Sequence, residues 1–325
     1  MIPLQGRRVL VTGGTGFIGS ALVRGLVARG ARVRCLDNQS RGAEHRLGDA
    51  LGRVELVTGD VRDAAVVARA TEGVESVYHL AYVNGTEFFY QKPDLVLEVA
   101  VKGMMNVLDA CLAAGVRDLA VASSSEVYQN APTIPTPEDV PLVVPDLANP
   151  RYSYGGGKII SELLAFNYGR SHFDRLVIFR PHNVYGPDMG TEHVIPQFAL
   201  RLLRHAHAGA GPVPFPIQGS GRETRAFVYI DDFTDGLLRV LECGAHLDVY
   251  NIGTTEEVAI ADLAHLVAAA LDRSITVLPG DLLPGSSLRR CPDITKLRAL
   301  GFVPRTALAE GVAATVAWYR DARLA

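Results

Sequence analysis

The chain begins with a short apolar run that ends in three evenly spaced glycines. Residues 8–12 are rich in β-branched side chains, which is typical of a strand buried on both faces of a parallel sheet, and Gly13, Gly16 and Gly19 follow. Glycines at this spacing let the backbone turn tightly into a helix and approach a pyrophosphate at the helix N-terminus. The pattern therefore predicts a strand, a tight turn and a helix, arranged for a dinucleotide or for steric reasons alone.

The next segment completes a βαβ unit with an acidic residue at its end. Residues 20–29 predict an amphipathic helix with Gly30 as its C-cap, and residues 33–37 predict a strand that ends in Asp37. A carboxylate about 20 residues beyond the glycines accepts hydrogen bonds from the ribose hydroxyls and repels a 2′-phosphate. The cofactor expected here is NAD, with Arg41 leaving NADP as the alternative.

Strands and helices then alternate up to about residue 183, which predicts a parallel sheet with helices on both faces. Further strands are expected at 54–58, 76–80, 119–122, 176–179, 226–230 and 249–253, and helices near 95–114, 153–171, 231–243 and 306–320. Proline and glycine become frequent after Gly186, and the last helix would bury Val312, Val316 and Tyr319. We predict a doubly wound α/β (Rossmann) domain of residues 1–183 plus about 226–252, and a smaller C-terminal α/β substrate-binding domain of about 184–225 plus 253–325.

Composition excludes several other classes of protein. The 325 residues are 48% hydrophobic with a net charge of −3, and they contain no basic cluster that would bind nucleic acid or an anionic membrane. The first strand leaves no room for a signal peptide, and no apolar run approaches the roughly 20 residues of a membrane span, so we expect a cytoplasmic protein. No metal site is expected, because the histidines do not have the spacing of metal ligands: His205 and His207 would face different sides of a helix. The four cysteines are scattered along the chain, and we expect them to be reduced packing residues: Cys35, Cys111, Cys243 and Cys291.

Tyr154 and Lys158 are four residues apart on a predicted helix and therefore lie on the same face. A free phenol has a pKa of about 10, but a nearby ammonium group and a positive nicotinamide ring favour the phenolate. Tyr154 could then move the proton of a substrate hydroxyl while NAD takes the hydride, with Lys158 also holding the ribose. The alternative is a surface Tyr/Lys pair without a catalytic role.

Two further features accompany this pair. Ser124 directly follows a predicted strand, at the sheet edge where catalytic groups collect, and could bond the same substrate oxygen as Tyr154. Residues 155–157 are all glycine, although each glycine costs a helix about 1 kcal/mol relative to alanine. We expect the bare backbone to let a cofactor or substrate pack closely, unless these glycines are merely local frustration.

These motifs together resemble the extended short-chain dehydrogenase/reductases, specifically the NAD-dependent nucleotide-sugar epimerase/dehydratase family. The resemblance covers nearly the whole chain and rests on GGTGFIG at 13–19, Asp37, GDVRD at 59–63, HLA at 79–81, SSSEVY at 123–128, YGGGK at 154–158, RPHNVYGP at 180–187, TRAF at 224–227, NIG at 251–253 and RCPD at 290–293. It implies an NAD enzyme that acts on a nucleotide-diphosphate sugar, and a homodimer formed through the helices near 95–114 and 153–171.

The resemblance also implies roles for individual residues. It implies catalytic roles for Ser124, Tyr154, Lys158 and Glu126, and contacts with the sugar nucleotide for Tyr82, Ser124, Ser125, Asn183, Arg225 and Arg290, of which Asn183 and the two arginines would hold the diphosphate. The NAD-binding residues it implies are Gly13, Thr15, Gly16, Phe17, Ile18, Gly19, Asp37, Asn38, Asp60, Val61, Leu80, Ala81, Tyr154, Lys158 and Pro181.

The reaction within the family is less constrained. Dehydratases of this family carry Asp-Glu where this chain has Ser125-Glu126, and a serine cannot protonate a leaving hydroxyl. Uronate decarboxylases carry Ser-Glu, but they place an arginine for the substrate carboxylate where this chain has Asp188, which has the wrong charge. Epimerisation at C4 through a transient 4-keto sugar needs no further acid from these residues and is the predicted activity. The most distant alternative is a non-catalytic NAD-binding scaffold.

Some positions depart from the family pattern. Gln129 stands where glycine is usual, Tyr82 follows the HLA motif, and Ala100 replaces a frequent asparagine. The segment 83–92 is rich in aromatic residues and is expected to shape the pocket, for a sugar that the sequence does not identify.

Overall fold

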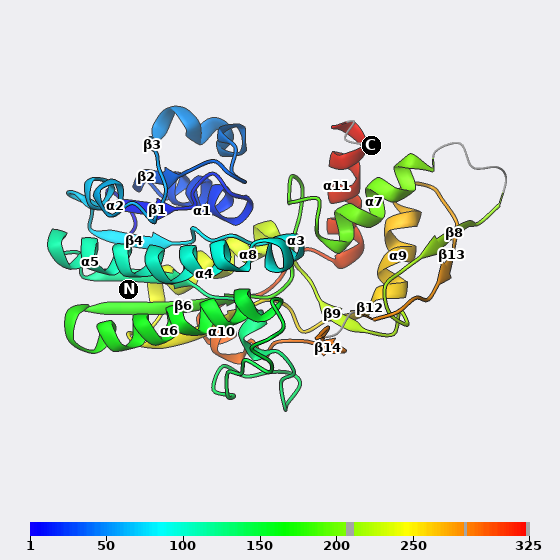
Figure 1. Cartoon of the computed structure of the whole chain (residues 1–325). Helices are drawn as coiled ribbons and strands as arrows, with labels where there is room; N and C mark the ends of the chain where they lie inside the picture. The colour runs from blue at the N-terminus through cyan, green and yellow to red at the C-terminus, as the bar shows by residue number, and fades with distance from the viewer. Residues whose placement is uncertain (206–210, 283–284, 323–325) are drawn as a thin grey trace.

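The computed structural model describes residues 1–205, 211–282 and 285–322, and its centre is a seven-stranded parallel sheet. The predicted doubly wound sheet is confirmed, with the strand order β11-β6-β5-β4-β1-β2-β3 (Figure 1). The strands are β1 (Arg8–Thr12), β2 (Arg32–Asp37), β3 (Glu55–Thr58), β4 (Ser76–His79), β5 (Asp118–Ala122), β6 (Arg175–Pro181) and β11 (Asp248–Ile252). The chain returns to the sheet at β11, as predicted, because β11 pairs with β6.

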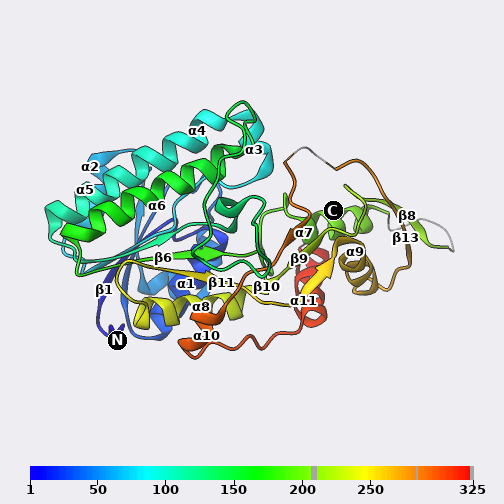
Figure 2. The ribbon, with the colours of Figure 1, turned by 90° about the horizontal axis from the view of Figure 1, so that it is seen from below.

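Alternate side chains of each strand pack against helices on opposite faces of the sheet. Val9 and Val11 belong to one core cluster, whereas Leu10 belongs to the other. The first face is covered by α1 (Phe17–Ala28), α8 (Ile230–Cys243) and α10 (Thr295–Ala299), and the second by α2 (Ala64–Thr71), α4 (Pro93–Glu98), α5 (Met104–Ala114) and α6 (Tyr152–His172) (Figure 2). Both faces of the sheet are therefore buried, which explains the continuous apolar character of its strands.

Two of the predicted helices begin or run differently in the structure. Helix α1 begins at Phe17, three residues before the predicted start, because Gly16 takes the extended N-cap conformation. The predicted helix near 95–114 is interrupted by a π-helical turn (Val99–Gly103) between α4 and α5. Gly103 lies at the end of this turn against Val61, where a Cβ atom would come within 2.8 Å of the valine side chain.

The remaining elements form a smaller layer beside the carboxyl edge of the sheet. Their core contains residues of three helices, and it buries Val312, Val316 and Tyr319 as predicted. The predicted strand 226–230 is wrong as a single element: Phe227 separates β9 from β10, and neither joins the main sheet. The elements are β7 (Val184–Tyr185), α7 (Val194–Arg204), β8 (Val213–Pro216), β9 (Thr224–Ala226), β10 (Val228–Tyr229), β12 (Glu257–Ala259), α9 (Ile260–Ala269), β13 (Ile275–Leu278), β14 (Arg289–Arg290) and α11 (Leu308–Asp321).

Three short helical segments remain to be named. The elements not yet named are α3 (Thr86–Gln91) and the 3-10 segments Glu44–Arg53 and Ser125–Tyr128. No helix in the described ranges combines the length and apolar character needed to cross a bilayer. Within those same ranges, no three metal-ligating side chains gather at one point.

Cys243 is exposed, so its prediction as a packing residue is wrong, while the other three cysteines are buried. His205 caps α7, and His207 lies outside the described residues.

Candidate active site

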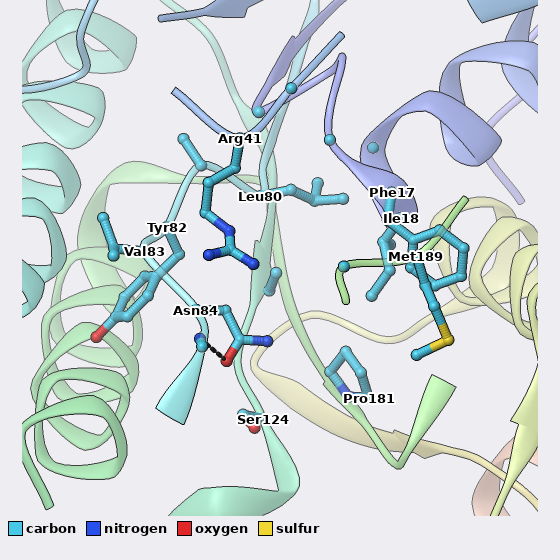
Figure 3. A pocket seen from close by; sticks show the side chains of 18 of the residues that line it. Phe17, Ile18, Arg41, Leu80, Tyr82, Val83, Asn84, Ser124, Pro181 and Met189 are labelled. Atoms are coloured by element: carbon cyan, nitrogen blue, oxygen red, sulfur yellow. Dashed lines mark hydrogen bonds between the residues drawn. The ribbon is translucent and has the colours of Figure 1, made fainter. Parts of the chain in front are cut away.

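A cavity of about 830 Å³ lies at the carboxyl edge of the sheet, where the predicted site residues meet. Figure 3 shows Phe17, Ile18 and Met189 on one side of this cavity and Tyr82 and Val83 on the other. Of the predicted residues, only Thr15 and Arg225 do not line it; those that do are Gly13, Gly16, Phe17, Ile18, Gly19, Asp37, Asn38, Asp60, Val61, Leu80, Ala81, Tyr82, Ser124, Ser125, Glu126, Tyr154, Lys158, Pro181, Asn183 and Arg290.

The glycine loop between β1 and α1 has no room for side chains. Gly13 has a φ of +72°, and a Cβ atom there would lie 2.8 Å from the backbone of Ala81. A Cβ atom on Gly19 would overlap the carbonyl oxygen of Gly13. Thr15 is fully buried beneath the loop, and its backbone N–H donates to Asp37. At Gly13, Gly16 and Gly19 the loop and the start of α1 thus present bare backbone, which fits a pyrophosphate group.

Asp37 is fixed at the end of β2 by backbone groups. Its carboxylate accepts hydrogen bonds from the N–H of Thr15 at 3.0 Å and from the N–H of Gln39 at 2.8 Å. Arg41, which kept NADP open as an alternative, forms an ion pair of 3.0 Å with Glu192 and lies over the ring of Phe88. The charge of Arg41 is therefore compensated within the protein, and the acidic end of β2 fits the adenosine ribose of NAD.

Ser124, Tyr154 and Lys158 come together below the cofactor loop. Lys158 donates a hydrogen bond of 2.7 Å to the carbonyl oxygen of Ala122, at the end of β5. Ser124 begins the 3-10 turn that follows, and its hydroxyl is a hydrogen-bond partner of the Tyr154 phenol. Phe89 of α3 stacks on the Tyr154 ring at a centroid distance of 4.8 Å. The end of β5, the turn after it and one face of α6 thus bring a hydroxyl, a phenol and an amine to the same end of the cavity.

The protein environment perturbs both titratable groups of this trio. Burial raises the pKa of Tyr154 to about 12, and the hydrogen bond with Ser124 opposes that rise only in part. Burial also lowers the pKa of Lys158 to about 7. The sequence predicted a Lys158 ammonium that lowers the tyrosine pKa, but the structure differs, because the lysine nitrogen lies 6.0 Å from the Tyr154 ring centroid and only 3.6 Å from that of Tyr82. Desolvation is the larger effect on Tyr154 here.

Three arginines surround Glu126 at the lower end of the cavity. Arg290 forms an ion pair of 2.6 Å with its carboxylate, and Arg151 and Arg225 also act on it electrostatically. Burial by itself favours the neutral acid, but the arginines outweigh it and hold the pKa of Glu126 below its usual range. Glu126 is therefore ionised at neutral pH.

The arginines themselves differ from expectation. Arg225 and Arg290 are neighbours on the paired strands β9 and β14. Burial, together with the charge of Arg290, lowers the pKa of Arg225 to about 10, and its guanidinium donates to the carbonyl oxygens of Thr224 and Ser287 instead of lining the cavity. Sequence reasoning missed Arg151, whose buried Nε atom has no hydrogen-bond partner among the described residues. No local pattern marks a residue that meets Glu126 only in three dimensions.

Asp188 and Asn183 also line the cavity. The Asp188 carboxylate is bonded to Arg46 at 3.0 Å and to His45 at 2.9 Å, so its charge is compensated. The sequence argument that Asp188 has the wrong charge to hold a substrate carboxylate did not include this pairing with Arg46. Asn183 has a φ of +41° and donates to the carbonyl oxygen of Ala226 at 2.8 Å, which ties β6 to the second layer.

The glycines 155–157 accommodate the protein's own side chains. A Cβ atom on Gly155 would lie 2.7 Å from Gln129 Nε2, and one on Gly157 would overlap the Tyr82 hydroxyl. Gly156 meets only a methyl group of Val144, at 3.4 Å. Two departures from the family pattern thus pack on two of the three glycines, and the expected close contact with a cofactor or substrate is replaced by contact with Gln129 and Tyr82.

Comparison with known proteins agrees with this geometry. UDP-glucuronic acid decarboxylase 5 of Arabidopsis thaliana is 33% identical over 94% of this chain and 87% of its own length. A dTDP-4-dehydro-6-deoxy-D-allose reductase of a Streptomyces species is 33% identical over 97% of each chain. The DesIV dTDP-glucose 4,6-dehydratase of Streptomyces venezuelae, solved with NAD, superimposes with a TM-score of 0.87 at 32% identity over 97% of this chain and 98% of that one.

A UDP-glucose 4-epimerase of Thermus thermophilus, also solved with NAD, gives a TM-score of 0.85 at 31% identity over 97% of this chain and 99% of that one. The family model described as the NAD dependent epimerase/dehydratase family matches residues 9–253. The chain therefore belongs to the NAD dependent epimerase/dehydratase family, and the cofactor of this protein is NAD.

Proposed function

We propose that the protein is a nucleotide-sugar 4-epimerase. Its relatives make it an NAD-dependent enzyme that modifies nucleotide sugars, and inversion at C4 is the finer assignment. The observation that carries the assignment is the state of Glu126, which is ionised and held by Arg290. Dehydration needs a protonated acid for the leaving hydroxyl, and neither this carboxylate nor Ser125 can supply that proton. Epimerisation needs only the proton carried by Tyr154.

In this proposal the residues around the cavity have separate roles in cofactor binding and proton transfer. The loop from Gly13 to Gly19 and Asp37 would hold NAD, which when bound accepts a hydride and returns it. Tyr154 takes the proton of the C4 hydroxyl as the ketone forms, and after the keto sugar has turned it returns a proton to the C4 oxygen while the hydride goes back to the opposite face of C4. Burial raises the pKa of Tyr154, so the phenolate that this step needs would be favoured by the positive nicotinamide ring of bound NAD, with Lys158 holding the ribose. We further propose that residues 1–183 with about 226–252 bind NAD, and about 184–225 with 253–325 bind the sugar nucleotide.

The test is to identify the products formed from a panel of UDP-, GDP-, CDP- and dTDP-sugars, including uronates, with catalytic NAD in D₂O. We expect a product of unchanged mass, inverted at C4 and without deuterium on carbon, because the hydrogen leaves and returns as hydride. A product that has lost water or carbon dioxide, with deuterium at C5, would replace the proposal. Conversion only with stoichiometric NADH would indicate a reductase. The control is the Tyr154→Phe variant, which should form no product.

Decarboxylation is the second candidate, and one observation favours it. Asp188 forms an ion pair with Arg46, so the charge that argued against a uronate substrate is compensated. The curated relatives that decarboxylate UDP-glucuronic acid support the same candidate. A uronate in the substrate panel therefore separates the two proposals directly.

We also propose that the protein is a homodimer formed through α4, α5 and α6. These helices carry apolar side chains that are exposed in the single chain: Leu97, Leu112, Ile160 and Leu163, of which Leu163 is 59% exposed. Such a patch on one helical layer is typical of a protein interface. Sedimentation velocity should give a dimer for the wild type and a folded monomer for Leu163→Asp. A wild-type monomer would contradict the proposal.

A further inference from the structure

We propose that Tyr82 is a positioning residue for the catalytic lysine, with its aromatic face holding the Lys158 ammonium beside Tyr154. The lysine nitrogen lies 3.6 Å from the centroid of the Tyr82 ring, well within the range of a cation–π contact. Among the described residues, its hydrogen-bond acceptor is the carbonyl oxygen of Ala122. The ring therefore supplies a second contact that favours the charged amine.

This contact matters because the lysine is otherwise poorly solvated. Lys158 is 4% exposed, and burial disfavours its charged form. The charged and titratable groups that face it are Glu162 on the next turn of α6, His79 on β4, and the two tyrosines. Burial lowers the pKa of His79 to about 3, so this imidazole stays neutral and does not compete with the ammonium.

The structure also shows how Tyr82 reaches this position. Figure 3 shows its ring turned from the end of β4 toward α6 and away from the middle of the cavity. The ring meets Tyr154 edge-on at 5.1 Å, and its hydroxyl donates to the Tyr154 carbonyl oxygen at 3.4 Å. Gly157 and Ala100 line the space that the hydroxyl enters, and neither has atoms beyond Cβ to block it. Tyr82 therefore packs against Gly157 and Ala100, and the small size of those two residues leaves room for its ring.

The experiment is an NMR titration of the lysine amines without substrate, so its outcome is independent of which sugar the enzyme converts. The chain has only four lysines, Lys92, Lys102, Lys158 and Lys296, so lysine labelled with ¹³C at Cε gives four resonances, and Lys158→Met assigns the relevant one. We expect Tyr82→Phe to leave the pKa of Lys158 unchanged, because it keeps the ring. Tyr82→Leu should lower that pKa by about 0.4 to 1.5, because it removes the ring.

A second series keeps the shape of the ring and changes only its charge distribution. Phenylalanines with increasing fluorine substitution at position 82 weaken the negative ring face, so the pKa of Lys158 should fall stepwise along the series. An unchanged pKa across this series, or an equal fall in Tyr82→Phe and Tyr82→Leu, would overturn the proposal. In turnover assays, we expect Tyr82→Leu to lower kcat with little change in KM, and Tyr82→Phe to lower kcat by less than Tyr82→Leu does. A loss of sugar affinity instead would make Tyr82 a substrate contact.

Discussion

Replacing Tyr154 with phenylalanine is expected to lower kcat by about 10²- to 10⁴-fold, because the variant keeps the ring and loses only the group that carries the proton. The stacking on Phe89 and the edge contact with Tyr82 involve the ring alone, so the fold around the site should be preserved. The Kd for NAD should stay near the wild-type value. Stopped-flow detection of NADH formation and product analysis together measure the loss at the chemical step.

Ser124→Ala is the matched control for this substitution. It removes the hydroxyl that hydrogen-bonds the Tyr154 phenol but leaves the proton carrier in place. The pKa of Tyr154 should rise further, because the hydrogen bond is one of the influences that lower it, and kcat should fall less than in Tyr154→Phe. A Tyr154→Phe enzyme with nearly wild-type kcat would show that another group moves the proton.

The local parts of the fold could be predicted from the sequence because their causes are local. The glycines at 13, 16 and 19 are required by backbone contacts within a few residues of the loop or with the neighbouring strand end. Continuous apolar runs predicted the strands of the central sheet to within about two residues. Asp37 lies at the end of a strand whose start and length follow from its own side chains. Local periodicity and turn chemistry are sufficient for such features.

The candidate site was harder to predict because its decisive contacts join distant residues. Arg290 is 164 positions from Glu126, and nothing near either residue reveals that they pair. Gly103, at the end of the π turn between α4 and α5, packs against Val61 from another loop. Tyr82 was expected to contact the sugar, and the cation–π contact with Lys158 depends on the absence of side-chain bulk at position 157. Each of these features follows from tertiary packing, which overrides local propensity.

The three consecutive glycines of α6, residues 155–157, give the second large expected effect, because they share one intrinsic helix propensity but pack against different neighbours. Gly156→Ala should raise the free energy of unfolding by about 1 kcal/mol and leave kcat unchanged, since the new methyl group meets only Val144 at ordinary contact distance.

Gly157→Ala should instead destabilise the protein by about 1 to 3 kcal/mol and lower kcat, because its methyl group overlaps the Tyr82 hydroxyl and lies 2.8 Å from the Cβ atom of Ala100. Displacing Tyr82 would also displace the amine of Lys158. Urea unfolding and turnover of the two single variants measure both effects, and the addition of Tyr82→Phe to Gly157→Ala should restore part of each by removing the overlapping oxygen. Equal stability of the two alanine variants would mean that this helix tolerates a side chain at either position, and that the packing of Tyr82 against Gly157 does not constrain the site.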